Sequence, residues 1–329
     1  MAFEEFKDIL VVMEVADDAP ASVSLENIAA AKSVAGEGKV IAVSVGSEAA
    51  AKTAIEYGAD CAFVVKGAQF EQYNADAVAD AAAQLCAEVK AAAIFTAATP
   101  AGKDLVARIA SKLKTGAVND ATGLKLDDNG NIQFTVPAYG GNILTDVVID
   151  SVRPQVASIR GGSVSKLEPA AGKAGDVVVK DITVADDQVR YAVKEAVKEI
   201  AETVNLEEAD VIVSGGRGMG SAENFEKLQE LADVLGGVVG CTRPAMESGW
   251  ISRAHQVGQS GKIVAPKLYF AFGISGATQH VSGMIGSKYI VAVNKDEEAP
   301  IFDVADVGIV GNAMDVLPVM IEEIKKVIG

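Results

Sequence analysis

The sequence predicts an α/β protein of two domains, each built on a parallel sheet. Half of the 329 residues are hydrophobic, while aromatic residues make up 5%. Such a composition, rich in alanine and valine, is typical of buried valine-rich strands covered by closely packed alanine-rich helices. Short apolar runs also alternate with helix-length segments. We therefore expect an N-terminal α/β domain with a sheet-rich extension over residues 1–186, and a Rossmann-like α/β domain over residues 187–329.

The first domain begins with alternating strands and helices. The ranges expected to form strands are residues 8–15, 39–45, 61–65 and 91–96. The ranges expected to form helices are residues 25–34 and 75–89, with a third helix that opens at Thr99 or Pro100. Connections of this length imply right-handed βαβ units.

Between Val118 and Lys180 the pattern changes to short strands with little helix between them. Asp127 to Gly130 is a strong turn signal. The strands expected here are residues 134–136, 143–149 and 156–160, and Tyr139 to Asn142 is favoured as a turn over a ligand loop. We interpret this region as the sheet-rich extension. A linker at residues 181–187 and an amphipathic helix at residues 191–204 lead to the second domain.

The second domain repeats the alternation. Its strands are expected at residues 211–213, 238–241, 263–264, 268–272, 289–293 and 307–310. Two helices have apolar stripes. One is formed by Phe225, Leu228, Leu231 and Leu235, and the other, at the C-terminus, by Met320, Ile324 and Val327, which are favoured as core over a partner surface. Four strand ends lead into loops rich in glycine, hydroxyl, amide or arginine groups. In an open parallel sheet such loops gather along one edge, where nucleotides bind.

The loop after Phe272 is the central candidate site. Gly273 and Gly276 form a tight turn into a short helix start, which carries Ser275, Thr278, Gln279 and His280. Unpaired backbone N–H groups and the positive end of the helix dipole favour a phosphate there. Glycines at residues 215–220 and a polar glycine loop at residues 256–262 follow two other strands, and glycine lets a ligand approach the backbone closely.

Charge and cysteine content exclude several classes of protein. The net charge of −16 argues against a nucleic-acid or anionic-membrane surface. Cys61, Cys86 and Cys241 form no CxxC pair, so neither a disulfide framework nor a zinc site is expected, and no other metal site is expected. The sequence has no signal-peptide pattern at its start and no apolar run of about 18 residues. We expect a cytoplasmic protein that is not inserted in a membrane.

Catalytic groups are scarce. Only two histidines occur, and no HExxH, GxSxG or P-loop motif is present. Such a site suits a bound cofactor that carries the chemistry itself. From spacing alone, Arg217 and Arg243 could each clamp a phosphate or form a surface ion pair, and His280 is favoured as a structural hydrogen-bonding group. Trp250 is expected to be a packing residue.

The segments SGGRG, CTRPAMESGW, QVGQSGK, YFAFGISGATQH and IVAVNKD, within residues 210–312, closely resemble the electron-transfer flavoprotein α subunit. GKDLVARIASKL, VPAYGGN and RPQVASIRGG resemble its first domain more loosely. The resemblance implies an FAD held in an extended pose on the C-terminal domain, beside a β subunit. It also implies an electron carrier rather than a substrate-converting enzyme, and an oxidoreductase only as a complex.

The resemblance assigns roles to individual residues. Arg217 would lie beside the FAD phosphates, Arg243 over the isoalloxazine, and His280 near its O2 atom, while Ser260 would bond N5. In full, the residues expected to bind the cofactor are Arg217, Thr242, Arg243, Gln256, Val257, Gly258, Gln259, Ser260, Ser275, Gly276, Ala277, Thr278, Gln279, His280, Asn294 and Asn312. Two positions depart from the family pattern. Asn312 replaces a common aspartate, which would weaken a contact to the adenosine half, and Val307 replaces a common tyrosine.

Arg243, His280 and Ser260 would tune the redox potential of the flavin. A cation over the ring and a donor near O2 favour the singly reduced, anionic flavin. At an effective dielectric near 20, a unit charge about 4 Å away contributes about 4 kcal/mol before screening.

The function expected from the resemblance is single-electron transfer by a heterodimer. The donors would be flavin dehydrogenases of the acyl-CoA dehydrogenase type, as in fatty acid β-oxidation, and electrons would pass to another acceptor. Electron bifurcation, a role for NADH and the contents of the β-subunit nucleotide site stay open. Two alternatives remain, namely a self-sufficient FAD oxidoreductase and a non-redox nucleotide-binding subunit.

Overall fold

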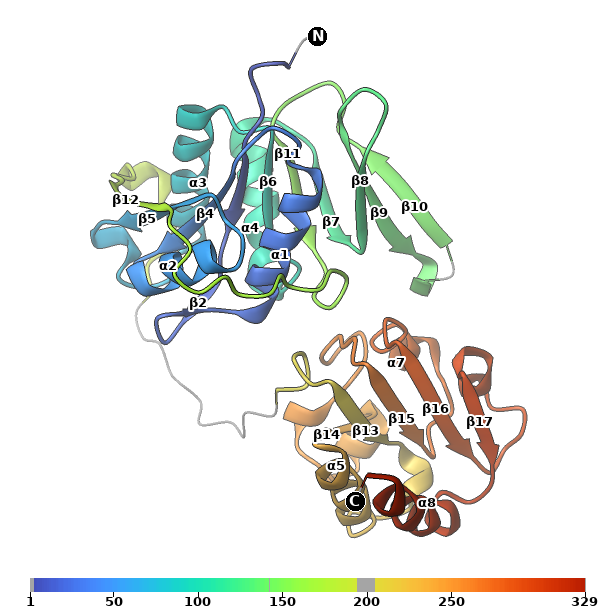
Figure 1. Cartoon of the computed structure of the whole chain (residues 1–329). Helices are drawn as coiled ribbons and strands as arrows, with labels where there is room; N and C mark the ends of the chain where they lie inside the picture. The colour runs from blue at the N-terminus through green and yellow to red at the C-terminus, as the bar shows by residue number, and fades with distance from the viewer. Residues whose placement is uncertain (1–2, 142, 194–204, 329) are drawn as a thin grey trace. The chain divides into compact units, whose positions relative to one another are not determined.

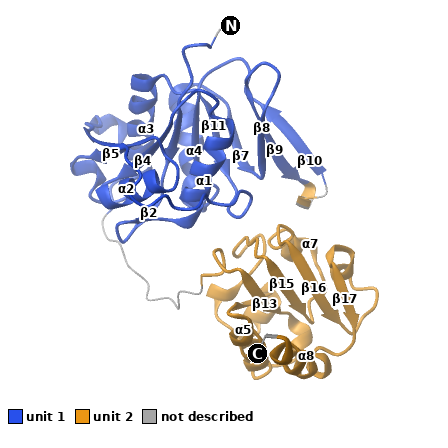
Figure 2. Cartoon of the chain, viewed as in Figure 1, with its two compact units in different colours: residues 1–138, 142–197 blue, residues 139–141, 198–329 orange. Residues whose placement is uncertain are grey.

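The computed structural model describes residues 3–141, 143–193 and 205–328. The chain divides into two compact units (Figure 2), Met1–Ala138 with Asn142–Val197, and Tyr139–Gly141 with Lys198–Gly329. Each unit contains a parallel sheet covered by helices (Figure 1), which confirms the predicted α/β class. Among the helices in the described ranges, none combines the length and apolar character needed to cross a membrane.

A seven-stranded sheet forms the centre of unit 1, and all its neighbouring strands are parallel. In spatial order the strands are β12 (Asp176–Asp181), β5 (Cys61–Lys66), β4 (Val40–Val45), β1 (Ile9–Val12), β6 (Ala93–Ala97), β11 (Gln155–Ile159) and β7 (Ala117–Ala121). Because successive strand residues point to opposite faces, Ile9 and Val11 join one hydrophobic cluster while Leu10 and Val12 join another. The sheet is therefore buried on both faces.

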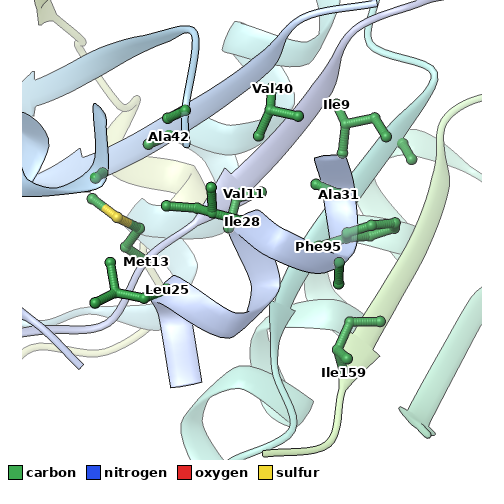
Figure 3. Close-up of a cluster of buried hydrophobic side chains, with 14 of the residues drawn as sticks. Ile9, Val11, Met13, Leu25, Ile28, Ala31, Val40, Ala42, Phe95 and Ile159 are labelled. Atoms are coloured by element: carbon green, nitrogen blue, oxygen red, sulfur yellow. The ribbon is translucent and has the colours of Figure 1, made fainter. Parts of the chain in front are cut away.

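Helices cover both faces of this sheet. They are α1 (Ser22–Val34), α2 (Glu48–Glu56), α3 (Ala75–Val89) and α4 (Pro100–Leu113), with 3₁₀ turns η1 (Ala68–Phe70) and η3 (Asp186–Gln188). Figure 3 shows Leu25 and Ile28 of α1 near Val11 of the sheet, within one buried cluster. On the other face α3 and α4 bury Leu85, Leu105 and other apolar side chains. Thr99 caps α4, as expected, because its side-chain oxygen accepts the Gly102 N–H at 3.0 Å.

Several predictions for unit 1 were wrong in detail. The strand expected at residues 8–15 ends at Val12, and β2 (Val15–Ala16) pairs instead with β3 (Ala19–Pro20). The strand expected at residues 156–160 is β11, which lies in the main sheet and not in the extension, because all five of its residues are buried between neighbouring strands. Neither α2 nor β12 was predicted.

The extension is a three-stranded antiparallel sheet of β8 (Gly123–Leu126), β9 (Ile132–Ala138) and β10 (Ile143–Val148). The 3₁₀ turn η2 (Tyr139–Gly141) follows β9, which agrees with the predicted turn. Phe134 of β9 packs edge-on against Phe95, with the ring centroids 6.0 Å apart. This contact joins the extension to the core of the main sheet.

The segment before the second unit packs on the start of α3. The Tyr191 hydroxyl accepts the Ala75 N–H at 2.8 Å, and the Tyr191 carbonyl accepts from the Asn74 side chain at 3.0 Å. The helix predicted at residues 191–204 does not begin at Tyr191, since residues 191–193 are irregular. Its remainder, residues 194–204, lies outside the described residues.

Unit 2 contains a five-stranded parallel sheet in the order β14–β13–β15–β16–β17. The strands are β13 (Val211–Gly215), β14 (Val238–Cys241), β15 (Leu268–Phe272), β16 (Tyr289–Asn294) and β17 (Val307–Val310). The helices are α5 (Phe225–Leu235), α6 (Arg243–Glu247), α7 (Thr278–Val281) and α8 (Ala313–Ile328), with 3₁₀ turns η4 (Arg217–Met219), η5 (Arg253–His255) and η6 (Pro300–Val304). The first strand of the unit lies between the second and third, so the strand order reverses at β13 and β15. Ligands of open α/β sheets bind outside the carboxyl ends of strands at this kind of reversal.

Two details of unit 2 differ from expectation. Residues 263–264 are irregular and do not form a strand. Along α8, Met320 and Ile324 pack partly against the core, but Val327 is 86% exposed. The helix buries Leu317 and Ile321 instead, so its last turn projects beyond the core. Trp250 packs against Phe225 with the ring centroids 6.2 Å apart, which confirms its structural role.

Candidate functional site

A groove of about 360 Å³ lies at the carboxyl ends of the strands of unit 2. Its lining residues are Gly216, Arg217, Gly218, Thr242, Pro244, Gly273, Ile274, Ser275, Ala277, His280 and Asn294. They come from the loops that follow β13, β14 and β15 and from the end of β16. The groove therefore occupies the edge where the order of the strands reverses, and it brings together several residues predicted far apart in sequence.

Backbone packed against backbone forms the floor of this groove. The Gly218 N–H donates to the Gly273 carbonyl at 3.0 Å. A Cβ on Gly216 would lie 2.3 Å from that carbonyl oxygen, and one on Gly218 would lie 2.7 Å from the Gly273 Cα. Gly273 has a φ of +59°, a region that favours glycine. Only glycine fits these positions, because a side chain on either loop would collide with the backbone of the other.

The expected helix dipole is small in this structure. α7 spans only four residues, Thr278–Val281, so few peptide dipoles are aligned in it. Gly276 has a φ of +88°, and a Cβ there would lie 2.2 Å from the Ile301 backbone nitrogen. The Ile301 N–H donates to the Ser275 carbonyl at 3.1 Å, which holds this turn in place. Polarity at the groove therefore depends mainly on loop backbone and side chains.

Arg217 lines the groove with an exposed side chain in η4. Within the part of the chain that the structure describes, no carboxylate forms an ion pair with it. Of the two interpretations from sequence, a site for an anion in the groove fits this environment better than a surface ion pair.

Arg243 lies between the groove residues Thr242 and Pro244 but does not itself line the groove. Its Nε donates to Glu247 Oε1 at 2.7 Å, and the two side chains are 63% and 54% exposed. This is the surface ion pair that was the alternative interpretation of Arg243. Exposed pairs at this spacing contribute about 0.3–0.5 kcal/mol, so a ligand could displace Glu247 at small cost.

Most buried polar groups in proteins form hydrogen bonds, but the Thr242 hydroxyl forms none within the described part of the chain. The residue is 6% exposed, and its Oγ1 has no hydrogen-bond partner among the described residues. A buried hydroxyl left without a partner costs about 1–3 kcal/mol. Because Thr242 lines the groove, a ligand there could supply the missing bond.

The loop at residues 256–262 packs beside the groove without lining it. Val257 is buried, and its N–H donates to the Cys241 carbonyl at 2.9 Å. The Gln256 amide donates to the Ser260 hydroxyl at 2.8 Å, and the Gln259 N–H donates to the Gln279 carbonyl at 2.8 Å. Gly258 has a φ of +136°. The loop is thus fixed between β14 and α7.

The two asparagines predicted on the adenosine side differ in position. Asn294 lines the groove and donates to the Ile274 carbonyl at 2.8 Å. Asn312 does not line it, and its Oδ1 instead accepts the Met314 N–H at 3.0 Å at the start of α8. Thr278 and Gln279, also predicted, lie on the exposed side of α7 next to the groove.

His280 is buried between two hydrogen-bond partners. Its Nδ1 lies 3.0 Å from the Val257 carbonyl oxygen, and its Nε2 lies 3.0 Å from the Tyr269 hydroxyl. Burial lowers the pKa of His280 to about 4, so the imidazole is neutral near pH 7. Burial also raises the pKa of the fully buried Tyr269 well above its usual range, so that hydroxyl keeps its proton.

Sequence reasoning did not identify Tyr269, which it placed only within a strand. The available signal was a tyrosine in an otherwise apolar strand, since a buried tyrosine hydroxyl usually has a partner. Cys86 and Cys241 are buried free thiols, and Cys61 is half-buried. No group of three or more metal-ligating side chains is found among the described residues.

Two families match the chain in sequence. Residues 9–187 match the family described as "Electron transfer flavoprotein domain". Residues 205–285 match the "Electron transfer flavoprotein FAD-binding domain", and these residues include most of the groove.

Individual relatives align over almost the whole chain. The electron transfer flavoprotein subunit alpha of Thermoanaerobacterium thermosaccharolyticum is 43% identical over 326 residues, which cover 98% of this chain and 99% of the relative. The subunit of the same name from Megasphaera elsdenii is 41% identical over 340 residues, covering 99% and 98%. Protein FixB of Clostridium saccharobutylicum is 40% identical over 333 residues, covering 100% and 99%. With both domains of the family matched and relatives aligned from end to end, this chain belongs to the electron transfer flavoproteins as an alpha subunit, and the unit that carries the groove is its FAD-binding domain.

Proposed function

We propose that the groove of unit 2 holds the FAD, and that this chain, paired with a beta subunit, passes electrons singly between flavin dehydrogenases and a second acceptor. The observation that carries the proposal is that Thr242, which lines a groove built on glycine backbone, has a buried hydroxyl without a partner among the described residues. Acid–base groups are scarce there, since His280 is the only histidine, aspartate, glutamate or lysine among the lining residues. This favours a carrier over an enzyme that converts a substrate.

The lining residues suit the chemical parts of a flavin dinucleotide. Arg217 and the backbone of residues 274–277 would bind the phosphates, since both cations and main-chain N–H groups stabilise anions. Thr242 and His280 would lie toward the redox ring, with Ser260 and Val257 on the neighbouring loop. The bound flavin supplies the electron chemistry, because its ring accepts and releases electrons one at a time.

Arg243 would contribute to tuning the flavin once its guanidinium leaves Glu247 and lies against the redox ring. Its pair with Glu247 is exposed and therefore weak, so the exchange costs little. Asn294 would remain the contact on the adenosine side. Asn312, bonded at the start of α8, would contribute little.

The electron donors are proposed to be dehydrogenases of the acyl-CoA dehydrogenase type, as the sequence resemblance implies. A cytoplasmic location is also proposed, and the three cysteines, which are free thiols, support it. Whether the pair bifurcates electrons depends on the beta subunit, and the alpha-subunit groove does not distinguish the two types.

Co-expression with the neighbouring beta subunit tests the proposal. The purified pair should be yellow, and Thr242→Val should retain less FAD than wild type. One flavin with AMP would indicate a simple carrier, and two flavins would indicate a bifurcating pair. A colourless pair that holds only AMP or ATP would favour the non-redox nucleotide-binding subunit. Substrate turnover by the isolated chain would favour the self-sufficient oxidoreductase.

A further inference from the structure

A second cavity, of about 310 Å³, lies in unit 1. Its lining includes Ile9 and Gln155, the first residues of β1 and β11, and Ala92, which precedes β6. Because these three strands are parallel, the cavity lies at their amino ends. It shares no lining residue with the groove of unit 2, and its volume is within the range of small-molecule sites, about 300–1,000 Å³.

Part of the cavity wall is apolar. Phe3 and Phe6 line it, with their rings edge-on and the centroids 6.1 Å apart. Val34 of α1, Leu126 of β8 and Ile132 of β9 also belong to this part of the wall. Aromatic and branched aliphatic side chains favour a ligand with an apolar body, because packing against them removes apolar surface from water.

Arg153 is a half-buried cation in the wall of this cavity. Its Nη1 donates to the carbonyls of Ile149 and Val152, at 3.1 and 2.9 Å. Its Nη2 donates to Asn131 Oδ1 at 2.6 Å, and its guanidinium carbon lies 4.4 Å from the centre of the Phe3 ring. A guanidinium has five N–H groups, and these bonds use three of them. Within the described ranges the other two have no partner, and no carboxylate forms an ion pair with Arg153.

The other charged residues that line the cavity are Glu4, Lys7 and Glu37, and all three are exposed. Lys7 Nζ pairs with Glu37 Oε2 at 3.3 Å, so these two charges largely cancel. Exposed charges are screened by water and salt, whereas a half-buried charge is screened less. The guanidinium of Arg153 is therefore the charge that a ligand in the cavity would meet most strongly.

The burial of Arg153 is only partly compensated. Burial is the largest influence on its pKa and lowers it, whereas the charges of Asp127 and Asp150 act in the opposite direction. A carboxylate placed against the guanidinium would add charge-assisted hydrogen bonds and offset the cost of burying the cation.

We propose that this cavity is a site, separate from the groove of unit 2, for a small carboxylate with an apolar body. The carboxylate would accept hydrogen bonds from the two N–H groups of Arg153 that have no partner among the described residues. The apolar body would pack against Phe6, Val34 and Leu126. The proposal does not depend on FAD binding, because the cavity and the groove lie in different units.

Titration of hexanoate into the chain paired with its beta subunit, followed by calorimetry at pH 7, tests this site. One hexanoate should bind per pair, with a dissociation constant of about 1 mM or lower. 1-Hexanol has the same apolar chain without the charge and should bind at least about tenfold more weakly. Arg153→Gln, which removes the charge but keeps an amide donor, should weaken hexanoate binding by about the same factor.

A second pair of variants separates loss of the site from a structural effect at Arg153. Leu126 lines the cavity and is 45% exposed, so Leu126→Trp should fill the cavity without disturbing the core and should abolish binding. Leu167 is 40% exposed in the same unit but does not line the cavity. Leu167→Trp should therefore bind hexanoate as wild type does.

Several results would overturn the proposal. They are no binding of hexanoate to wild type, equal affinity of wild type and Leu126→Trp, and hexanol binding as tight as that of hexanoate. Release of bound flavin by hexanoate would place the acid in the groove of unit 2 and would also overturn it. A colourless pair that binds hexanoate with the expected effects of the variants would count against FAD binding but would support this cavity, so the two failures can be told apart.

Discussion

Two deeply buried ionisable side chains, one in each unit, differ in charge at pH 7, since one is ionised and the other is neutral. Asp76 in the first turn of α3 is 2% exposed, and His280 in unit 2 is 6% exposed. Burial alone would make both neutral, since it disfavours the charged form of any group. The difference between them comes from the partners that each fold provides.

Asp76 stays ionised because two guanidinium groups reach it. Its Oδ1 accepts from Arg108 Nη1 at 2.5 Å and from Arg190 Nη2 at 2.7 Å. These bonds, those from Arg190 above all, hold the pKa of Asp76 well below its ordinary value. His280 has instead a carbonyl and a hydroxyl as partners, neither of which carries charge. Whether a buried group is ionised therefore depends on the polarity and charge of its neighbours more than on its depth.

The pH dependence of stability gives the largest expected effect. The pKa of His280 falls from 6.5 to about 4 on folding, so between these pH values the unfolded chain binds a proton that the folded chain does not. The contribution of His280 to the free energy of unfolding is complete above pH 6.5 and is lost as the pH falls toward 4. In total it is about 3 kcal/mol. Urea unfolding of the flavin-free protein should show this slope.

His280→Gln supplies the comparison for that experiment. It should flatten the slope between pH 6.5 and 4, and it should leave the separate loss below pH 3.8, where Asp76 binds a proton on unfolding, in place. An unchanged slope between pH 6.5 and 4 would contradict the neutral assignment of His280.

Removal of the Asp76 charge gives the next largest expected effect on stability. Asp76→Ala should lower the free energy of unfolding by about 2 kcal/mol, because it removes charge-assisted hydrogen bonds to Arg108 and Arg190. Both arginines are partly exposed and can regain water, which limits the loss. Asp104→Ala is the matched control, since Asp104 also pairs with Arg108 but is 49% exposed. Equal losses in the two variants, measured by urea unfolding at pH 7, would show that burial of the carboxylate adds nothing.

Substituting a glycine in the floor of the groove tests whether backbone packing, without a buried charge, can hold the cofactor. Gly218→Ala should place a Cβ 2.7 Å from the Gly273 Cα and force the two loops apart, at a cost of about 1–2 kcal/mol. FAD retention after dialysis should fall by about tenfold. In Gly161→Ala the nearest atom, Val23 Cγ2, is at an ordinary 3.5 Å, so retention should match wild type. Full retention in Gly218→Ala would mean that the cofactor does not depend on this close approach.

The exposed pair of Arg243 and Glu247 gives the smallest effect and a third environment for comparison. Arg243→Ala should lower the flavin midpoint potential and destabilise the singly reduced flavin in a spectroscopic titration, by less than the unscreened estimate because the side chain is 63% exposed. Glu247→Gln should act in the opposite direction, because it frees the guanidinium. If neither variant changes the potential, Arg243 has no part in tuning the ring.

The sequence predicted much of the site because its signals are local. The glycines at residues 215–220, the turn at Gly273 and Gly276, and Arg217 stand directly after apolar strands, where parallel-sheet geometry brings ligand loops together. Asn294, at the end of such a strand, also lies at the groove. Asn312 follows a strand as well, but that strand, β17, is at the edge of the sheet. Only the strand order reveals that it is removed from the groove.

The parts that sequence reasoning missed depend on contacts between distant residues. β11 looks like one more strand of the extension, yet it lies between β6 and β7 because its five residues are buried from both sides. In sequence, Tyr269 was placed only within a strand and nothing linked it to the candidate residue His280; the bond between them joins α7 to β15.

By itself, the amino-acid sequence determined the α/β class, the family, the glycine-backed groove and the cofactor, because periodicity, glycine placement and motifs act over short stretches of chain. Only the tertiary structure decided the charge of each buried group. It gave Asp76 two guanidinium partners and gave His280 a hydroxyl and a carbonyl. Ionisation in a protein interior depends on which distant groups folding brings within hydrogen-bonding range, and that information is absent from any single segment.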